Sequence, residues 1–201
     1  MTFDDAMLRV AEKTILSPER LRGLWDAVKD ANQAKVPGDL VECGCWRGGS
    51  AAILGLADDT RRRLWVLDSF AGMPAPSEKD PPQAAAEIGL CVATEDDVVK
   101  FLVDEGLSSR VITVPGLFKD TIPILPVQKI AVLHIDCDWY ESVKQCLEGL
   151  YDKVSATGTI QFDDYGHWPG ARVAVDDFFR GRGIQPGLSI LDYTGRQHRK
   201  P

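Results

Sequence analysis

The chain has 201 residues, 44% of them hydrophobic and 26% charged, so a single domain can bury a full core without disulfides or structural metals. Its formal net charge of −7 argues against a nucleic-acid-binding protein, which normally carries a basic surface. No apolar run approaches the roughly 18 residues of a membrane span, and the acidic N-terminus lacks a signal-peptide pattern, so we expect a cytoplasmic protein.

The predicted elements begin with two amphipathic helices over residues 3–34, broken near Ser17-Pro18. Apolar runs then alternate with helical patterns, which is typical of a doubly wound, mostly parallel α/β sheet. Strands are predicted at 39–43, 64–67, 111–114, 130–135 and 159–162, and helices at 50–57, 96–105, 142–154 and 171–179. The tail, residues 188–200, is predicted to form a hairpin. We therefore expect a helical segment over 1–37 and one domain over 38–201.

Residues 71–94 form a long stretch rich in proline, alanine and acidic residues, and we expect a lid-like loop there. The five cysteines are an odd number in a chain without a secretory signal, which favours buried, reduced thiols over a disulfide framework. Cys43 and Cys45 are close in sequence, but no second pair completes a zinc site.

The first two strands lead into residues suited to a nucleoside-like ligand, because open α/β sheets bind ligands at the carboxyl ends of their strands. Three glycines (Gly44, Gly48 and Gly49) allow a ligand close to the backbone, and the following helix N-terminus favours an anionic group. The spacing matches neither G-x-G-x-x-G nor a P-loop, so a ligand with a single carboxylate is favoured over a pyrophosphate. Asp68 ends the second strand, where it can accept ribose hydroxyls. The alternative is a tight turn with a helix-capping aspartate.

Acidic residues also follow the fourth and fifth strands, which should be neighbours. Asp136, Asp163 and Asp164 would form a hard oxygen site suited to Mg²⁺, Ca²⁺ or Mn²⁺. The alternative is that Asp163 and Asp164 cap the next helix. Asp138 is a fourth candidate, but strand alternation places it beyond the strand, beside Trp139.

Four segments make the sequence resemble the macrocin O-methyltransferase family, whose members methylate sugar hydroxyls and have the class I methyltransferase fold. They are residues 38–49 (GDLVECGCWRGG), 67–74 (LDSFAGMP), 134–142 (HIDCDWYES) and 163–170 (DDYGHWPG). The sequence also resembles, more loosely, catechol O-methyltransferase, which carries its metal-binding acids at the ends of the same two strands. The position of that enzyme's lysine base is Trp139 here, so the lysine role does not transfer.

The resemblance implies a single-domain, Rossmann-like fold with a seven-stranded, mostly parallel sheet and a C-terminal antiparallel hairpin. It implies S-adenosylmethionine as the methyl donor and Mg²⁺, or another divalent cation, on Asp136, Asp163 and Asp164. The expected cofactor contacts are Glu42, Gly44, Ser50, Asp68, Ser69, Phe70, Gly116 and Asp136. Methyl transfer is an in-line displacement that needs an aligned, activated hydroxyl, and we expect Asp136 or His167 to take its proton.

Two other functions remain open at this level. A nicotinamide-dependent oxidoreductase would also use the strand–loop–helix and Asp68, and a non-catalytic cofactor-binding protein would need no acceptor. For an O-methyltransferase we expect a small-molecule hydroxyl acceptor, such as a sugar or another vicinal diol. We expect neither a nucleic-acid nor a membrane partner, and the size of the chain is compatible with a homodimer.

Overall fold

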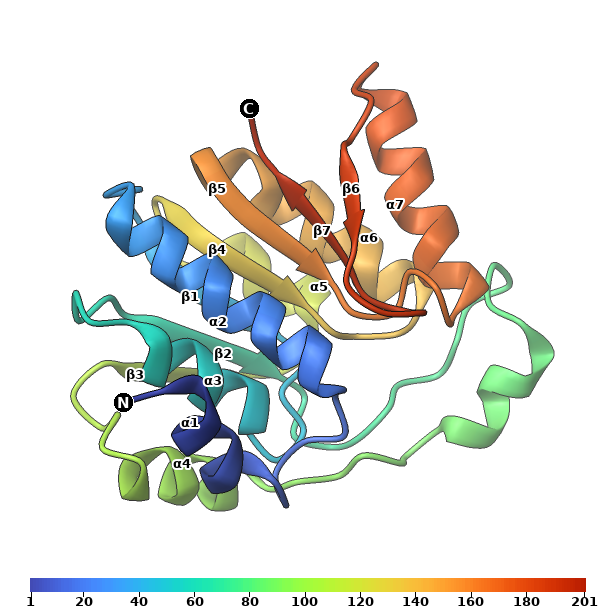
Figure 1. Cartoon of the computed structure of the whole chain (residues 1–201). Coiled ribbons are helices and arrows are strands. Elements are labelled where there is room, and N and C mark those ends of the chain that lie inside the picture. The colour runs from blue at the N-terminus through green and yellow to red at the C-terminus, as the bar shows by residue number, and fades with distance from the viewer.

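The computed structural model describes all 201 residues, and its centre is one seven-stranded sheet (Figure 1). The strands are β1 (Asp39–Cys43), β2 (Leu64–Asp68), β3 (Val111–Pro115), β4 (Ile130–Ile135), β5 (Val154–Phe162), β6 (Leu188–Ile190) and β7 (Arg196–Arg199). Their order is β3-β2-β1-β4-β5-β7-β6. β1 to β5 pair in parallel, whereas β7 is antiparallel to both β5 and β6. The predicted parallel sheet with a C-terminal antiparallel hairpin is confirmed.

The helices are α1 (Phe3–Val10), α2 (Pro18–Gln33), α3 (Gly49–Ala57), α4 (Glu95–Asp104), α5 (Phe118–Thr121), α6 (Tyr140–Leu150) and α7 (Pro169–Gly181), with short 3₁₀ helices η1 (Pro82–Glu87), η2 (Ile122–Ile124) and η3 (Tyr151–Lys153). The predicted break before Pro18 is the N-cap of α2, because the Ser17 hydroxyl accepts from the backbone N–H of Arg20 at 3.2 Å. None of the helices combines the length and apolar composition that crossing a bilayer requires.

Strand alternation builds two separate cores, one on each face of the sheet. Leu40 and Val132 face the side covered by α1 to α4, whereas Val41 and Leu133 face α6 and α7. In Figure 1, α2 crosses in front of the sheet, and α6 lies behind it. A polar residue an even number of positions from Leu40 in β1, or from Val132 in β4, therefore points toward the face covered by α1 to α4.

Among the differences from the sequence-based expectation, three concern the sheet and the helices that lead to its edge. β5 begins at Val154 rather than at Thr159, because Val154 pairs with Ile130 ahead of an irregular segment that resembles a turn in sequence. The short helix α5 was not predicted. α6 begins at Tyr140 rather than Ser142, because a carboxylate oxygen of the distant Asp80 accepts from the Tyr140 backbone N–H at 2.9 Å.

The long loop is anchored at its base by the same aspartate. Asp80 also accepts from the backbone N–H of Ser77 at 2.8 Å, and the Trp139 indole donates to the Pro74 carbonyl at 2.9 Å. A side chain at Gly170 would overlap Asp80, with a Cβ only 1.8 Å from its Oδ1. The loop between β2 and α4, drawn in teal to green in Figure 1, is therefore a folded wall containing η1.

All five cysteines are free thiols, as predicted. Four are buried, but Cys91 lies in the long loop and is exposed, so the expectation of burial is wrong for that residue.

Candidate active site

Three polar side chains interrupt the apolar strands at one level of the sheet. His134 of β4 is the register partner of Glu42 in β1 and of Gln161 in β5. All three are completely buried and share the parity that points toward α2. Burial of such groups requires partners, so this row predicts a hydrogen-bonded polar layer beneath the helix.

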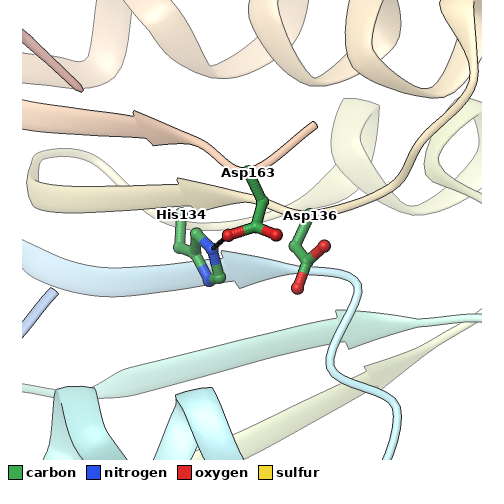
Figure 2. A group of neighbouring side chains, drawn as sticks. All are labelled: His134, Asp136 and Asp163. Atoms are coloured by element: carbon green, nitrogen blue, oxygen red, sulfur yellow. Dashed lines mark ion pairs between the residues drawn. The ribbon is translucent and has the colours of Figure 1, made fainter. Parts of the chain in front are cut away.

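His134 lies between two carboxylates, both fully or nearly fully buried. Its Nδ1 is 2.9 Å from Glu42 Oε1. Its Nε2 is 3.6 Å from Asp163 Oδ1, the ion pair drawn in Figure 2. Burial alone would lower the imidazole pKa, but interaction with the carboxylates of Asp163 and Glu42 and the charge of Asp136 raise the pKa of His134 to about 10. We therefore describe His134 as an imidazolium at neutral pH.

The ligating atoms of His134, Asp136 and Asp163 all lie within 4.8 Å of one another (Figure 2). This compactness resembles a metal site, but a protonated imidazole has no lone pair to offer. Within this group the two carboxylates are the ligands that suit a hard cation such as Mg²⁺. Sequence reasoning missed His134, although a histidine inside an otherwise apolar strand was a usable signal.

Four carboxylates form what we call the acid cluster: Asp136, Asp138, Asp163 and Asp164. Burial and the neighbouring carboxylates raise the pKa of Asp136 and of Asp164 well above the usual range. Burial and the charge of Asp163 raise the pKa of Asp138 to about 7. None of these three residues forms an ion pair with a cationic side chain. Of the three predicted ligands, Asp136 and Asp163 have carboxylate oxygens within 4.8 Å of each other, whereas Asp164 is not part of that group. Oxygen ligands of this kind suit a divalent cation of the Mg²⁺ class.

Asp138 lies closer to the other acids than strand alternation predicts. Its backbone has a left-handed φ of 58°, and its N–H donates to Asp164 Oδ2 at 3.1 Å. The chain therefore turns back immediately after β4 and returns Asp138 to the cluster, where an extended continuation would have carried it away.

Arg20 of α2 contacts the carboxylate of Asp163 and also lies 3.0 Å from Asp192. The sequence did not indicate this contact, because the two partners are distant in the chain and an arginine near a helix start is commonplace. The segment 1–37, expected as a separate helical region, thus reaches the acid cluster.

The cofactor-side loop is shaped by Asp68 and Gly44. The Asp68 carboxylate accepts from the backbone N–H of Cys45 at 2.7 Å, of Trp46 at 3.2 Å and of Phe70 at 2.9 Å. Gly44 has a φ of +85°, and a Cβ there would lie 1.8 Å from the carbonyl oxygen of Asp136. The glycine loop therefore packs directly against the acid cluster, and glycine is required there for both reasons.

A cavity of about 530 Å³ connects the two groups of residues. The predicted residues that line it are Gly44, Ser50, Asp68, Ser69, Gly116, Asp136, Asp163, Asp164 and His167. Two predicted cofactor contacts, Glu42 and Phe70, do not line it: Glu42 is fully buried against His134, and Phe70 packs against the core. His167 is exposed at the rim, with its Nδ1 3.4 Å from the Tyr193 hydroxyl.

The connection between α1 and α2 closes one side of this cavity. Residues 13–16 line it, and the Lys13 carbonyl accepts from the backbone N–H of Gly49 at 3.0 Å. This contact ties the N-terminal segment to the start of α3, where the sequence predicts an anionic group of the cofactor.

Residues 7–200 match the Macrocin-O-methyltransferase (TylF) family. The chain is 39% identical over 196 residues to the 8-demethyl-8-(2,3-dimethoxy-alpha-L-rhamnosyl)-tetracenomycin-C 4'-O-methyltransferase of Streptomyces olivaceus. It is 37% identical over 192 residues to the demethyldecarbamoylnovobiocin O-methyltransferase of Streptomyces niveus. Each alignment covers 90% of this chain and 73% of the relative. The solved structure of the O-methyltransferase NovP is 36% identical with a TM-score of 0.86, covering 94% of this chain and 82% of that one. Arg20 and the whole acid cluster lie within the matched residues.

Proposed function

This chain belongs to the macrocin O-methyltransferase family and is an S-adenosylmethionine-dependent O-methyltransferase, and we propose that it methylates a sugar hydroxyl of a glycosylated natural product at a divalent-cation site. One observation carries the proposal: the glycine loop and the acid cluster share a single cavity, with Gly44 packed on the backbone of Asp136. A methyl donor and a chelated hydroxyl bound there would be neighbours, as in-line displacement requires.

The donor side of the cavity offers the contacts that a nucleoside with an amino-acid tail needs. Gly44 leaves backbone accessible, Ser50 lies in the first turn of α3, and the Asp68 carboxylate is fixed at the end of β2. Asp68 is already oriented by backbone N–H groups, and its remaining lone pairs can accept from ribose hydroxyls. Gly116 and Ser69 complete this wall.

The acceptor side of the cavity combines aromatic surface with excess negative charge. Trp139, Trp168 and Tyr193 line it, and carboxylates outnumber the cationic side chains of the wall. Aromatic surface of this kind suits the apolar face of an uncharged sugar or of its scaffold. The lining therefore supports a sugar already attached to an apolar scaffold, consistent with the rhamnosyl-tetracenomycin named for one relative.

The acid cluster fits a divalent cation held by Asp136, Asp163 and Asp164. Besides the unpaired carboxylates described above, Asp163 Oδ1 is buried without a hydrogen-bond donor. When bound, such a cation supplies Lewis acidity that lowers the pKa of a coordinated hydroxyl and fixes its position.

Two carboxylates that line the cavity are candidates to accept the hydroxyl proton. The sequence favoured Asp136, but the structure adds Asp138, which lines the same cavity. Asp138 is held beside Asp164, whose Oδ2 accepts from its backbone N–H at 3.1 Å, within reach of an acceptor in this cavity. His167 lies at the rim and remains the second candidate.

The decisive experiment measures methyl transfer from S-adenosylmethionine to a neutral glycoside and to the corresponding nucleotide sugar, with Mg²⁺ and with EDTA. We expect transfer to the glycoside alone, lost in EDTA and restored by Mg²⁺. Asp164→Asn should reduce the Mg²⁺-dependent rate at least about 100-fold, whereas the exposed control Asp104→Asn should not. Full activity in EDTA would refute the cation, and preference for the nucleotide sugar would refute the acceptor class.

The remaining expectations from the sequence stay predictions. We propose that the enzyme works in the cytoplasm on a small-molecule acceptor, without nucleic-acid or membrane partners, and that a homodimer is allowed. Size-exclusion chromatography with light scattering would measure its oligomeric state.

A further inference from the structure

Arg20 is the one cationic side chain of α2 that reaches the acid cluster. Its Nη1 contacts Asp163 Oδ2, and its Nε is 3.0 Å from Asp192 Oδ2. Both carboxylates are largely buried, and the arginine side chain is only 13% exposed. Such a pair is held in a surrounding of low dielectric, so its geometry is well defined and its charges are only weakly screened by salt.

The surrounding residues fix the position of Arg20 in three ways. The Gln161 amide donates to the Arg20 carbonyl at 3.2 Å, which attaches the first turn of α2 to β5. At Gly23 a Cβ would lie 3.0 Å from Gln161 Oε1, so the absence of a side chain brings the helix close to the sheet. Asp192, which accepts from Ser17 Oγ at 2.7 Å, holds the guanidinium from its other side.

Arg20 contacts one oxygen of the carboxylate that a cation would also use. Figure 2 shows one Asp163 oxygen directed toward His134 and the other toward Asp136. The oxygen near His134 is Oδ1, so the one facing Asp136 is Oδ2, which Arg20 occupies. A cation shared by Asp136 and Asp163 would therefore bind the same carboxylate as the guanidinium.

We propose that Arg20 is an internal counter-cation that competes with the divalent cation for Asp163, so that metal binding displaces its guanidinium from this carboxylate toward Asp192. This inference rests on the proposed cation site. Arg20 stabilises the metal-free cluster by neutralising Asp163, and the same contact weakens metal affinity. It also couples cation binding to α2, which carries the adjoining wall of the cavity.

The test is direct Mn²⁺ binding, measured by calorimetry and by the electron paramagnetic resonance signal of free Mn²⁺, without donor or acceptor. Arg20→Met keeps the aliphatic stem that packs against Gly195 but removes the charge. We expect it to bind Mn²⁺ at least about tenfold more tightly than the wild type, with Arg20→Lys between the two. Arg22→Met, on the same helix but half exposed and 3.7 Å from Asp4, is the matched control and should leave affinity unchanged.

Thermal melting gives a second readout. Arg20→Met should melt below the wild type in EDTA but gain more from saturating Mn²⁺, since only this variant binds without displacing an arginine. Should Arg20→Met not fold without metal, Arg20→Lys carries the same comparison. Equal or weaker Mn²⁺ affinity in the Arg20 variants, with the wild type binding normally, would overturn the competition and leave the proposed function intact. Absence of Mn²⁺ binding in every form would overturn both.

Discussion

Replacement of His134 by leucine tests whether the polar layer beneath α2 is charged. The substitution removes an imidazolium that lies 2.9 Å from Glu42, where both side chains are fully buried. It leaves the Glu42 carboxylate without a partner, which typically costs about 3–5 kcal/mol. The rise of the His134 pKa from 6.5 to about 10 corresponds to at most ~5 kcal/mol, so the two estimates agree in order of magnitude.

The measurement is urea unfolding at pH 7 in EDTA, compared among three variants. His134→Leu should lose about 3–5 kcal/mol of unfolding free energy. Adding Glu42→Leu should recover much of that loss, because it removes the unpaired buried charge and fills the space with apolar groups. The control Gln161→Leu removes hydrogen bonds at the same level without removing a charge and should cost about 1–2 kcal/mol.

The pH dependence of the unfolding free energy gives an independent check that His134 stabilises the fold as a cation. A pKa raised in the folded state contributes stability that is fully present below the unfolded-state value near 6.5 and is lost as pH rises through about 10. The deficit of His134→Leu should therefore shrink at alkaline pH. A loss below about 1 kcal/mol at pH 7, or a double variant less stable than His134→Leu, would show that the histidine is neutral and would refute the reasoning.

Three further predictions concern other parts of the structure. Gly44→Ala places a Cβ against the carbonyl of Asp136 at a left-handed φ and should abolish S-adenosylmethionine binding in calorimetry; unchanged affinity would contradict the packing described. Asp80→Ala removes the cap of α6 and the anchor of the long loop, so it should cost about 1–2 kcal/mol and expose residues 75–95 to limited proteolysis, whereas an unchanged digestion pattern would show another anchor. Burial would raise the pKa of Asp58, but hydrogen bonds from Thr60 and Arg62 and the charge of Arg110 lower it overall. Its stabilisation should therefore be present above the unfolded-state pKa near 3.9 and lost as pH falls through the lower folded value, and Asp58→Asn should flatten that acid limb of the stability curve.

Much of the sheet was predictable because its signal is local. β1 and β4 have the expected bounds, since each is a mostly apolar run, interrupted once by Glu42 or His134, that is buried on both faces. The acids at the ends of β4 and β5 were predicted to converge because parallel strands end at one edge of the sheet. The cavity does bring Asp136, Asp163 and Asp164 together with Gly44 and Asp68.

The electrostatic character of the site was not predictable in the same way. Asp138 joins the acid cluster through a single left-handed residue, and strand periodicity carries no information about such a turn. Glu42 was expected to contact the cofactor, but its register partner His134 holds it within the sheet. The long loop was expected to be lid-like because its anchor is not visible in the local sequence. Asp80 accepts from the backbone N–H of Tyr140, sixty residues later, at the start of α6.

The sequence by itself determined the order of strands and helices, the glycine turn and the acidic strand ends, because periodicity and turn chemistry depend on residues close together in the chain. Only the tertiary structure decided which charges meet. Arg20 reaches Asp163 because α2 packs closely on β5 at Gly23, and His134 is charged because two carboxylates from neighbouring strands enclose it. Electrostatic energy depends on distance and burial in space, and separation along the chain fixes neither.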